Sequence, residues 1–341
     1  MKNYPGILVV VLAIGISGPA AQADHRRGGA CTETSSLMQS ACRAEVRDDY
    51  YVESAKCVNE SEFLERFECG FEARETYRED RGLCDEQFEA RQSVCRALGQ
   101  APYDPRFESE DFETSLAALT HPNPYFPLAV GNQWVYDGDE EIRIDVLDET
   151  KLIDDITCFV VRDVVTVDGR LVEDTDDWLA VSRIDGAIWY CGEEVKDYEY
   201  FDGDEPMLAE LVSIDGSFKV ERDGDRAGVF FPGYPVPGDV YRQEFSLGNA
   251  EDIGEVVSTS YGWGVDPELD QLVPQELAEH LCHNDCVVVA EYTPIEPEVF
   301  ERKYFAPGIG FFLGTNPVDD ESVQLVGCNF SALCQGLPDP E

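Results

Sequence analysis

The stretch CTETSSLMQSACRAEVRDDYYVESAKC, residues 31–57, decides how the first part of the chain folds. It belongs to a region, residues 31–98, that has no proline, few β-branched residues and many Glu, Arg and Ala. Such a composition predicts α-helix. We expect two long helices, about 31–57 and 61–98, with N-caps offered by Asn59 and Ser61 and a C-terminal stop at Gly99.

Six cysteines in this region predict how the two helices are joined. They lie at 31, 42, 57, 69, 84 and 95, so the gaps of 11, 15, 12, 15 and 11 form a palindrome. Because a helix turns about 100° per residue, steps of 11 and 15 return to within about 20° and 60° of the same face. An antiparallel hairpin would bring these thiols together as three disulfides: Cys31 with Cys95, Cys42 with Cys84, and Cys57 with Cys69.

The same gaps also fit a repeat of 26–27 residues, in which positions 31, 57 and 84 are equivalent and 42, 69 and 95 are equivalent. That pattern would suit three helices with a different pairing. The short link at 58–60 favours the antiparallel hairpin. In either arrangement we expect a cross-linked rod with balanced surface charge, which suits a spacer or a docking surface better than an active site.

The first 23 residues indicate export. Lys2 is followed by the apolar run ILVVVLAIGI (7–16), and Ala21-Gln22-Ala23 has the small-x-small pattern of a cleavage site. These features are typical of a secretory signal peptide (1–23), with an uncleaved anchor as the alternative. We expect no membrane span after cleavage and a periplasmic or extracellular protein, in which the 12 cysteines form disulfides.

The chain is strongly acidic. Residues 24–100 hold 17 acidic and 11 basic side chains, a net of −6, whereas residues 101–341 hold 53 and 13, a net of −40. Such a field repels nucleic acid and anionic membranes and attracts cations or basic partners. A solvated acidic surface, as in proteins from salty habitats, explains the same composition.

The period of hydrophobicity changes along the chain. Residues 99–125 have four prolines and no sustained period, which predicts a linker. From 126 the period is two, and Asp-Gly turn signals occur six times. Strands are predicted at 141–149, 158–167, 176–184, 187–190, 217–222, 286–292, 302–306 and 309–314. The fold class is α+β in two parts, a disulfide-stapled helical hairpin (24–98) followed by an antiparallel β domain (126–341), either a sandwich or a curled sheet.

One hairpin of the β domain can be predicted residue by residue. If Asp185-Gly186 is a two-residue turn, Ser182 faces Trp189 on the opposite strand. The side chains then divide between two faces, with Leu179, Val181, Ile188 and Tyr190 on one and Trp178, Ala180, Trp189 and Cys191 on the other. Both faces carry apolar groups, so we expect this hairpin to be covered on both sides.

Five long segments carry a resemblance. They are NPYFPLAVGNQWVYD (123–137), LVEDTDDW (171–178), DGAIWYCGE (185–193), PGDVYRQEF (237–245) and TPIEPEVFERKYFAPGIG (293–310). The chain resembles, over most of residues 40–327, a family of uncharacterised secreted bacterial proteins. This resemblance implies the two-part architecture and no particular activity. Members tend to have an aromatic residue where this chain has Cys191, and that departure suggests a local disulfide with Cys158.

The segment EHLCHNDC, residues 279–286, is a candidate metal site. In one continuous helix, Cys282 would point about 100° or more away from both His280 and His283. Such a helix cannot gather all four side chains around a tetrahedral Zn²⁺. His280 and His283 with nearby carboxylates form a candidate site for Cu²⁺ or Zn²⁺.

The four C-terminal cysteines admit two pairings. A loop between Cys282 and Cys286 would bring them together as a disulfide in an oxidising compartment, which pairs Cys328 with Cys334. Alternatively, the first two cysteines bond crosswise to the last two. Both arrangements consume the thiols as structure.

Two further groups of residues are candidate binding sites. The segments EDTDDW (173–178) and ERDGDRAG (221–228) resemble the oxygen-rich loops that Ca²⁺ prefers, although neither fits an EF-hand loop. Asp223 and Asp225 are the candidate Ca²⁺ ligands. Aromatic side chains near acidic groups suit a sugar platform, while ordinary strand packing explains them equally. They are Trp178, Trp189, Tyr198 and Tyr200.

Motifs of the common enzyme classes are missing from the sequence, including the Gly-x-Ser-x-Gly elbow, His-Glu-x-x-His and the Walker loop. We therefore expect an exported, non-enzymatic envelope or extracellular protein whose β domain binds a cation, a glycan or a basic partner. One alternative is a transition-metal-binding protein that uses His280 and His283. Another is a secreted hydrolase with a carboxylate pair that the sequence does not locate.

Overall fold

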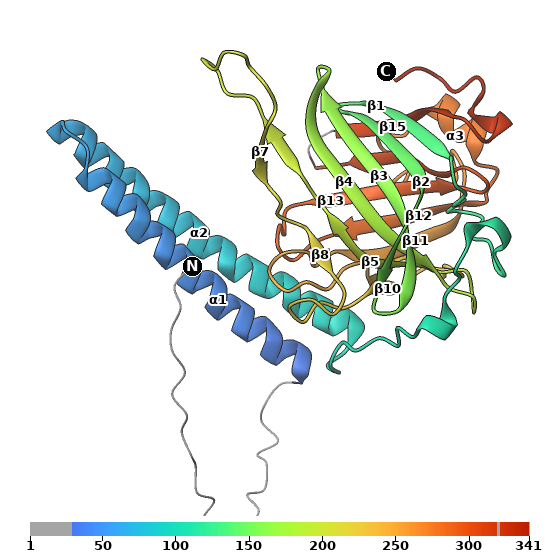
Figure 1. The fold of residues 1–341 in the computed structure, drawn as a ribbon, viewed down its shortest axis with the longest axis horizontal. Coiled ribbons are helices and arrows are strands. Elements are labelled where there is room, and N and C mark those ends of the chain that lie inside the picture. The colour runs from blue at the N-terminus through green and yellow to red at the C-terminus, as the bar shows by residue number, and fades with distance from the viewer. Residues whose placement is uncertain (1–28, 319–320, 341) are drawn as a thin grey trace, which may run out of the picture.

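The protein consists of a helical rod and a large β part, as the composition predicts (Figure 1). The computed structural model describes residues 29–318 and 321–340. The predicted signal peptide, residues 1–23, lies outside the described residues. No helix within them is long and apolar enough to cross a membrane.

The rod is a pair of antiparallel helices, α1 (Ala30–Val58) and α2 (Phe63–Leu98). Three disulfides join them in the palindromic order, with Cα–Cα distances of 5.7, 5.8 and 5.4 Å from the base to the tip. The prediction of a hairpin is confirmed, and the three-helix alternative is wrong. Few side chains of the pair are buried, so the cross-links replace the core that two helices alone cannot form. Each contributes about 3–4 kcal/mol by restricting the unfolded chain.

The helix ends differ in part from the prediction. Gly99 ends α2 with φ at 91°, as expected of a glycine stop. Asn59 does not begin the second helix but ends the first, where its Nδ2 donates to the Ala55 carbonyl over 2.8 Å. Ser61 lies one residue before the N-cap position of α2, Glu62, which makes no side-chain capping bond. The predicted N-caps were therefore wrong.

The tip of the rod lies far from the β part (Figure 1). Its connection and the first turns of α2 expose large apolar side chains, with exposed fractions between 67 and 77%. They are Val58, Phe63, Leu64 and Phe67.

The β part is one continuous antiparallel sheet of 15 strands. Along the main path the order is β10-β11-β12-β13-β14-β15-β1-β2-β3-β4-β5-β8, with β9 also paired to β5. The strands are β1 (Gln133–Gly138), β2 (Glu141–Ile153), β3 (Ile156–Val167), β4 (Arg170–Val181), β5 (Ile188–Glu194), β6 (Asp197–Glu199), β7 (Glu210–Ser213), β8 (Phe218–Lys219), β9 (Gly228–Phe231), β10 (Val240–Arg242), β11 (Ile253–Tyr261), β12 (Cys286–Tyr292), β13 (Phe300–Ala306), β14 (Gly310–Asn316) and β15 (Glu321–Cys328).

The sheet curls until its two ends meet. The Gln243 side chain, just after β10, donates to the Phe230 carbonyl of β9 over 3.3 Å, and Arg226 forms an isolated bridge with Phe245. Of the two predicted arrangements, the curled sheet is therefore the observed one. The short helices are α3 (Gln275–Leu281), η1 (Ser109–Asp111), η2 (Leu116–Ala118) and η3 (Ala332–Cys334).

Apolar side chains on both faces of β4 and β5 are covered, as predicted. The inner face joins the main core, and the outer face joins a smaller cluster under residues of the linker such as Phe107 and Phe112. The predicted register is wrong by two residues, because Ala180 and not Ser182 faces Trp189. A slip of two leaves every side chain on its own face, so the predicted faces survive the error.

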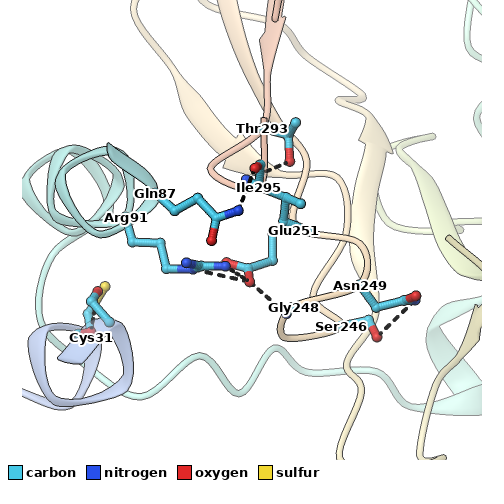
Figure 2. A network of polar contacts seen from close by, with 10 residues as sticks. Cys31, Gln87, Arg91, Ser246, Gly248, Asn249, Glu251, Thr293 and Ile295 are labelled. Atoms are coloured by element: carbon cyan, nitrogen blue, oxygen red, sulfur yellow. Dashed lines mark hydrogen bonds and ion pairs between the residues drawn. The ribbon is translucent and has the colours of Figure 1, made fainter. Parts of the chain in front are cut away.

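A buried ion pair joins the rod to the sheet (Figure 2). Arg91 of α2 donates from Nε and Nη2 to the Glu251 carboxylate, over 2.9 and 2.7 Å at the closest contacts. The Gly248 amide donates to the same carboxylate over 2.8 Å. Gln87 adds a bond to the Ile295 carbonyl, also over 2.8 Å. The side chains of Arg91 and Glu251 are only 6% and 2% exposed. If one of them were removed, bulk water would have little access to the charge of the other.

Removing one member of this pair should destabilise the protein far more than removing both. Arg91→Met leaves the Glu251 carboxylate buried and unpaired, which should lower the free energy of unfolding by about 3–5 kcal/mol. Arg91→Met combined with Glu251→Leu should recover most of that loss. Urea denaturation followed by circular dichroism measures both.

The matched control is Arg43→Met, which removes an ion pair with Asp85 whose partners are 40 and 55% exposed. It should cost less than about 1 kcal/mol. Equal losses for Arg43→Met and Arg91→Met would contradict a structural role for the buried pair.

Candidate functional site

A cavity of about 610 Å³ lies on the inner side of the curled sheet. One part of its wall is apolar and comes from several strands and from the segment before β1. The main apolar residues are Phe126, Val161, Leu179, Phe230, Phe305 and Phe311. The other part is polar, and it includes Asp163, Asp177, Glu291, Glu301 and Lys303.

Strand alternation directs these side chains inward. On β3, Asp163 follows Val161 by two residues, and on β4 Asp177 precedes Leu179 by two. Because residues two apart share a face, each carboxylate points the same way as its apolar neighbour in the core. Lys303 and Phe305 on β13 both line the same cavity.

A β-bulge adds a further carboxyl group. Trp178 pairs with Gly192, but the next residue, Leu179, pairs with Tyr190, so Cys191 is an extra residue in β5. The bulge brings Glu193 opposite Asp177 and turns it to the side of Tyr190. Gly192 has φ at 129°, and a Cβ there would lie 2.3 Å from the Phe218 carbonyl oxygen, so this position requires glycine.

The Tyr190 hydroxyl contacts two carboxyl groups at once. It donates to Asp177 and lies 2.9 Å from Glu193 Oε2. Burial raises the pKa of Asp177 to about 7, although the hydrogen bond from Tyr190 opposes the shift. Burial and then the neighbouring Asp177 raise the pKa of Glu193 well above its usual value. Both carboxyl groups of this pair therefore lose their protons at a higher pH than a carboxyl group in water.

Further carboxyl groups extend the cluster. Burial, followed by repulsion from Glu193, raises the pKa of Glu244 well above its usual range. Burial raises the pKa of Asp252 to about 6. Burial, followed by repulsion from Asp177, raises the pKa of Asp163 well above its usual range. We call this set the interior acid cluster; it comprises Asp163, Asp177, Glu193, Glu244, Asp252, Glu291 and Glu301.

Lys303 is the one basic side chain among the described residues that line the cavity. Its Nζ lies 2.5 Å from Glu291 Oε2 and 3.7 Å from Glu301 Oε2. Gln243 Nε2 donates to the second oxygen of Glu291 over 2.8 Å. Burial alone would lower the pKa of Lys303, but the two carboxylates outweigh it and keep the ammonium charged.

Asp163, which lines the cavity, has a buried Oδ1 atom without a hydrogen-bond partner within the described residues. Leaving a buried polar atom unpaired costs about 1–3 kcal/mol. A ligand with hydrogen-bond donors or a positive charge would relieve this cost at Asp163. The cavity therefore has the chemistry of a binding site for cations, with an apolar wall for the rest of the ligand.

The structure does not place additional metal ligands beside His280 and His283 within the described residues. Cys282 and Cys286 form a disulfide, and so do Cys328 and Cys334, which confirms the local pairing over the crosswise one. His280 Nε2 lies 2.8 Å from the Leu333 carbonyl oxygen. The described part of the chain contains no group of three or more His, Cys, Asp or Glu residues that could hold a metal ion. Metal binding at His280 and His283 stays a prediction.

The two candidate Ca²⁺ ligands, Asp223 and Asp225, differ in their exposure to solvent. Asp223 lies in an exposed turn with φ at 55°, while Asp225 is buried. The Asp225 carboxylate is hydrogen-bonded to Ser246. The structure does not bring these two carboxylates together with a third acidic group in the described residues.

The four aromatic residues do not form one platform. Trp178 is buried in the outer cluster beneath Lys151, whose Nζ lies 3.1 Å from the ring centroid. Trp189 packs against Phe107 and Phe112. Tyr198 lies on β6, and Tyr200 follows that strand. The suggested disulfide between Cys158 and Cys191 is present beside Trp178 and cross-links β3 to β5.

The interior acid cluster was missed from the sequence. Asp163 and Asp177 follow the alternation of their strands and could have been assigned to the inner face. Glu193 could not, because strict alternation from Tyr190 places it on the outside and only the bulge reverses it. Glu244, Asp252 and Glu291 lie 50 or more residues further along the chain, and only the closure of the sheet brings them near.

Comparison with known proteins gave no match among protein-family models, curated proteins or solved structures. The resemblance to secreted bacterial proteins stays a prediction. The assignment of function therefore rests on the geometry of the cavity.

The raised carboxyl pKa values predict that the protein loses stability as pH rises. The native state keeps protons on Asp177 up to about pH 7, whereas the unfolded chain loses them near pH 3.8. Stability therefore falls between about pH 4 and pH 7. The melting temperature should be higher at pH 5 than at pH 8. The expected difference is about 2–4 °C for each kcal/mol lost from the free energy of unfolding.

Asp177→Asn is the matched variant, since an amide oxygen can still accept the Tyr190 hydrogen bond and carries no charge. Thermal melts of the variant should fall less steeply between pH 5 and pH 8. A variant whose melting temperature follows the wild-type slope would show that Asp177 has no raised pKa.

Proposed function

We propose that this chain is an exported, non-enzymatic binding protein whose β part takes up an organic cation with an apolar body. The observation that carries the proposal is the cavity in the curled sheet, whose wall combines four members of the interior acid cluster, Asp163, Asp177, Glu291 and Glu301, with large apolar side chains. Of the three predicted ligand classes (cation, glycan or basic partner), this division of the wall suits a cation best. The ammonium group would lie at Asp163 and Asp177, and the apolar body against Phe230, Phe305 or Phe311.

The crowding of the carboxyl groups supports the same proposal. Carboxylates that share a low-dielectric site repel one another and cannot all ionise. Burial and this repulsion raise their pKa values. A bound ammonium group would neutralise part of it and would displace protons from the cluster. Binding should therefore strengthen as pH rises from 5.5 to 8, because Asp177 with a pKa of about 7 becomes ionised over that range.

Export is part of the proposal. The predicted signal peptide supports it, and the six disulfides are typical of proteins from oxidising compartments. The stapled hairpin would then serve as a rigid spacer at the cell envelope or outside the cell. Its tip, which carries the exposed side chains of Phe63 and Phe67, lies far from the β part (Figure 1).

Calorimetric titration with octylammonium, and with octan-1-ol as the uncharged analogue, tests the proposal. At pH 8 and 150 mM salt, octylammonium should bind at least tenfold more tightly than octan-1-ol, about 1.4 kcal/mol. Asp163→Asn should remove most of this preference, because an amide keeps the side-chain shape but cannot ionise to pair with the ammonium group.

Asp148→Asn is the control, since Asp148 is an exposed carboxylate on β2 outside the cavity. It should leave octylammonium binding unchanged and so separates the cavity from the general acidic field. Equal losses in the two variants would mean that the whole surface charge attracts the cation, and the proposal would be wrong.

A hydrolase is the second candidate function, and the shared contacts of Tyr190 favour it. Asp177, which lines the cavity, and Glu193 both contact the Tyr190 hydroxyl, and an acid with a pKa of about 7 is suited to proton transfer near neutral pH. If this candidate is right, a panel of 4-nitrophenyl glycosides should contain a substrate, and Asp177→Asn and Glu193→Gln should each reduce kcat at least 100-fold. Turnover that survives both substitutions would refute this role for the pair.

A further inference from the structure

A second pocket lies where the rod meets the sheet. It has a volume of about 380 Å³ and is bounded by the base of both helices, by linker residues 99–105 and by β10. Its walls are mainly apolar, with contributions from Val94, Leu98, Pro102, Trp189 and Val240. The charged residues that line it, among those the structure describes, are Arg91, Arg242 and Glu251.

Arg91 has one free donor in this pocket. Its Nε and Nη2 are bound to Glu251, as Figure 2 shows. Its Nη1 is buried and has no hydrogen-bond partner in the described part of the chain. Because the whole side chain is only 6% exposed, bulk water has little access to this donor. An unpaired buried donor on a charged group is costly, and it marks a position where an acceptor would be stabilised.

Arg242 is a second cation without an acceptor. The centre of its guanidinium lies 5.5 Å from the ring centroid of Tyr103 and 4.9 Å from that of Phe245. No ion pair or hydrogen bond of this side chain occurs within the described residues. Glu251 is the carboxylate that attracts it, but Glu251 is already held by Arg91 and by the Gly248 amide. Two guanidinium groups thus share one carboxylate, which leaves a positive charge uncompensated.

This local excess of positive charge contrasts with the whole chain, whose formal net charge is −45. An exposed arginine would find a carboxylate easily on such a surface. Arg242 instead lies beside two aromatic rings that contact each other, in a pocket whose walls are mainly apolar. The arrangement is that of a site for an anion that carries an apolar group.

We propose that the junction pocket binds a small monocarboxylate with an aliphatic or aromatic body. Its carboxylate would accept from Arg91 Nη1 and from the guanidinium of Arg242, and its body would lie along Val94, Leu98 and Val240. A ligand in this place contacts the rod and the sheet together. It would therefore stabilise their junction, while the interior acid cluster on the other face of the sheet would not take part.

Titration of the full-length secreted chain with octanoate tests the proposal, with octan-1-ol as the uncharged probe and calorimetry as the readout. Octanoate should bind at least tenfold more tightly than octan-1-ol. Arg242→Gln should weaken octanoate binding at least tenfold, and Arg242→Lys should give an intermediate loss because it keeps the charge without the planar fork.

Arg78→Gln is the matched control, since Arg78 is exposed on the rod and lies outside the pocket. It removes the same charge and should leave octanoate binding unchanged. Circular dichroism and a thiol assay verify that each variant is folded and fully oxidised. Equal binding of octanoate and octan-1-ol, or equal affinities of Arg242→Gln and Arg78→Gln, would overturn the proposal.

The two proposed sites can be separated with the same variants. Asp163→Asn should leave octanoate binding unchanged, and Arg242→Gln should leave octylammonium binding unchanged. If octylammonium fails to bind while octanoate binds through Arg242, the proposed function of the cavity is wrong and the junction pocket stands.

Discussion

The closure of one antiparallel sheet on itself is the constraint on which the rest of the β part depends. Every strand in such a sheet sends alternate side chains inward, and closure makes all of these share one interior. In this chain the inward set of β3, β4, β12 and β13 contains carboxyl groups as well as large apolar residues. The interior thus divides into a packed region and an acidic cavity. The pKa values of the carboxyl groups are raised because these groups are buried close to one another.

The rod depends on a different physical principle. Two helices bury too little apolar surface to hold together alone, and three disulfides along their length replace a core. The junction with the sheet relies on the buried pair of Arg91 and Glu251, where each charge needs the other. This pairing also leaves the buried Arg91 Nη1 without a partner beside the junction pocket, so the contact that holds the rod also provides a donor for a ligand.

Prediction from the sequence was most accurate where local periodicity decides the structure. The helices, the three hairpin disulfides and the faces of β4 and β5 follow from spacing alone. It was less accurate where loops set the outcome: Asn59 ends a helix instead of beginning one, and the Asp185-Gly186 turn is longer than two residues. The candidate sites at His280, Asp223 and Trp178 were chosen by residue type, and the structure gives those residues separate surroundings.

The sequence by itself determined the two-part fold, the hairpin pairing and the overall acidity, because these depend on residue spacing and composition. Only the tertiary structure decided which carboxyl groups meet. The bulge at Cys191 turns Glu193 inward, and closure of the sheet brings Glu244, which follows β10, close to Glu193 and Glu291. It likewise decided that Arg91 and Arg242 share Glu251. The electrostatic interaction between two side chains depends on the distance between them in space. For residues far apart in the sequence, that distance is set only when the strands pair.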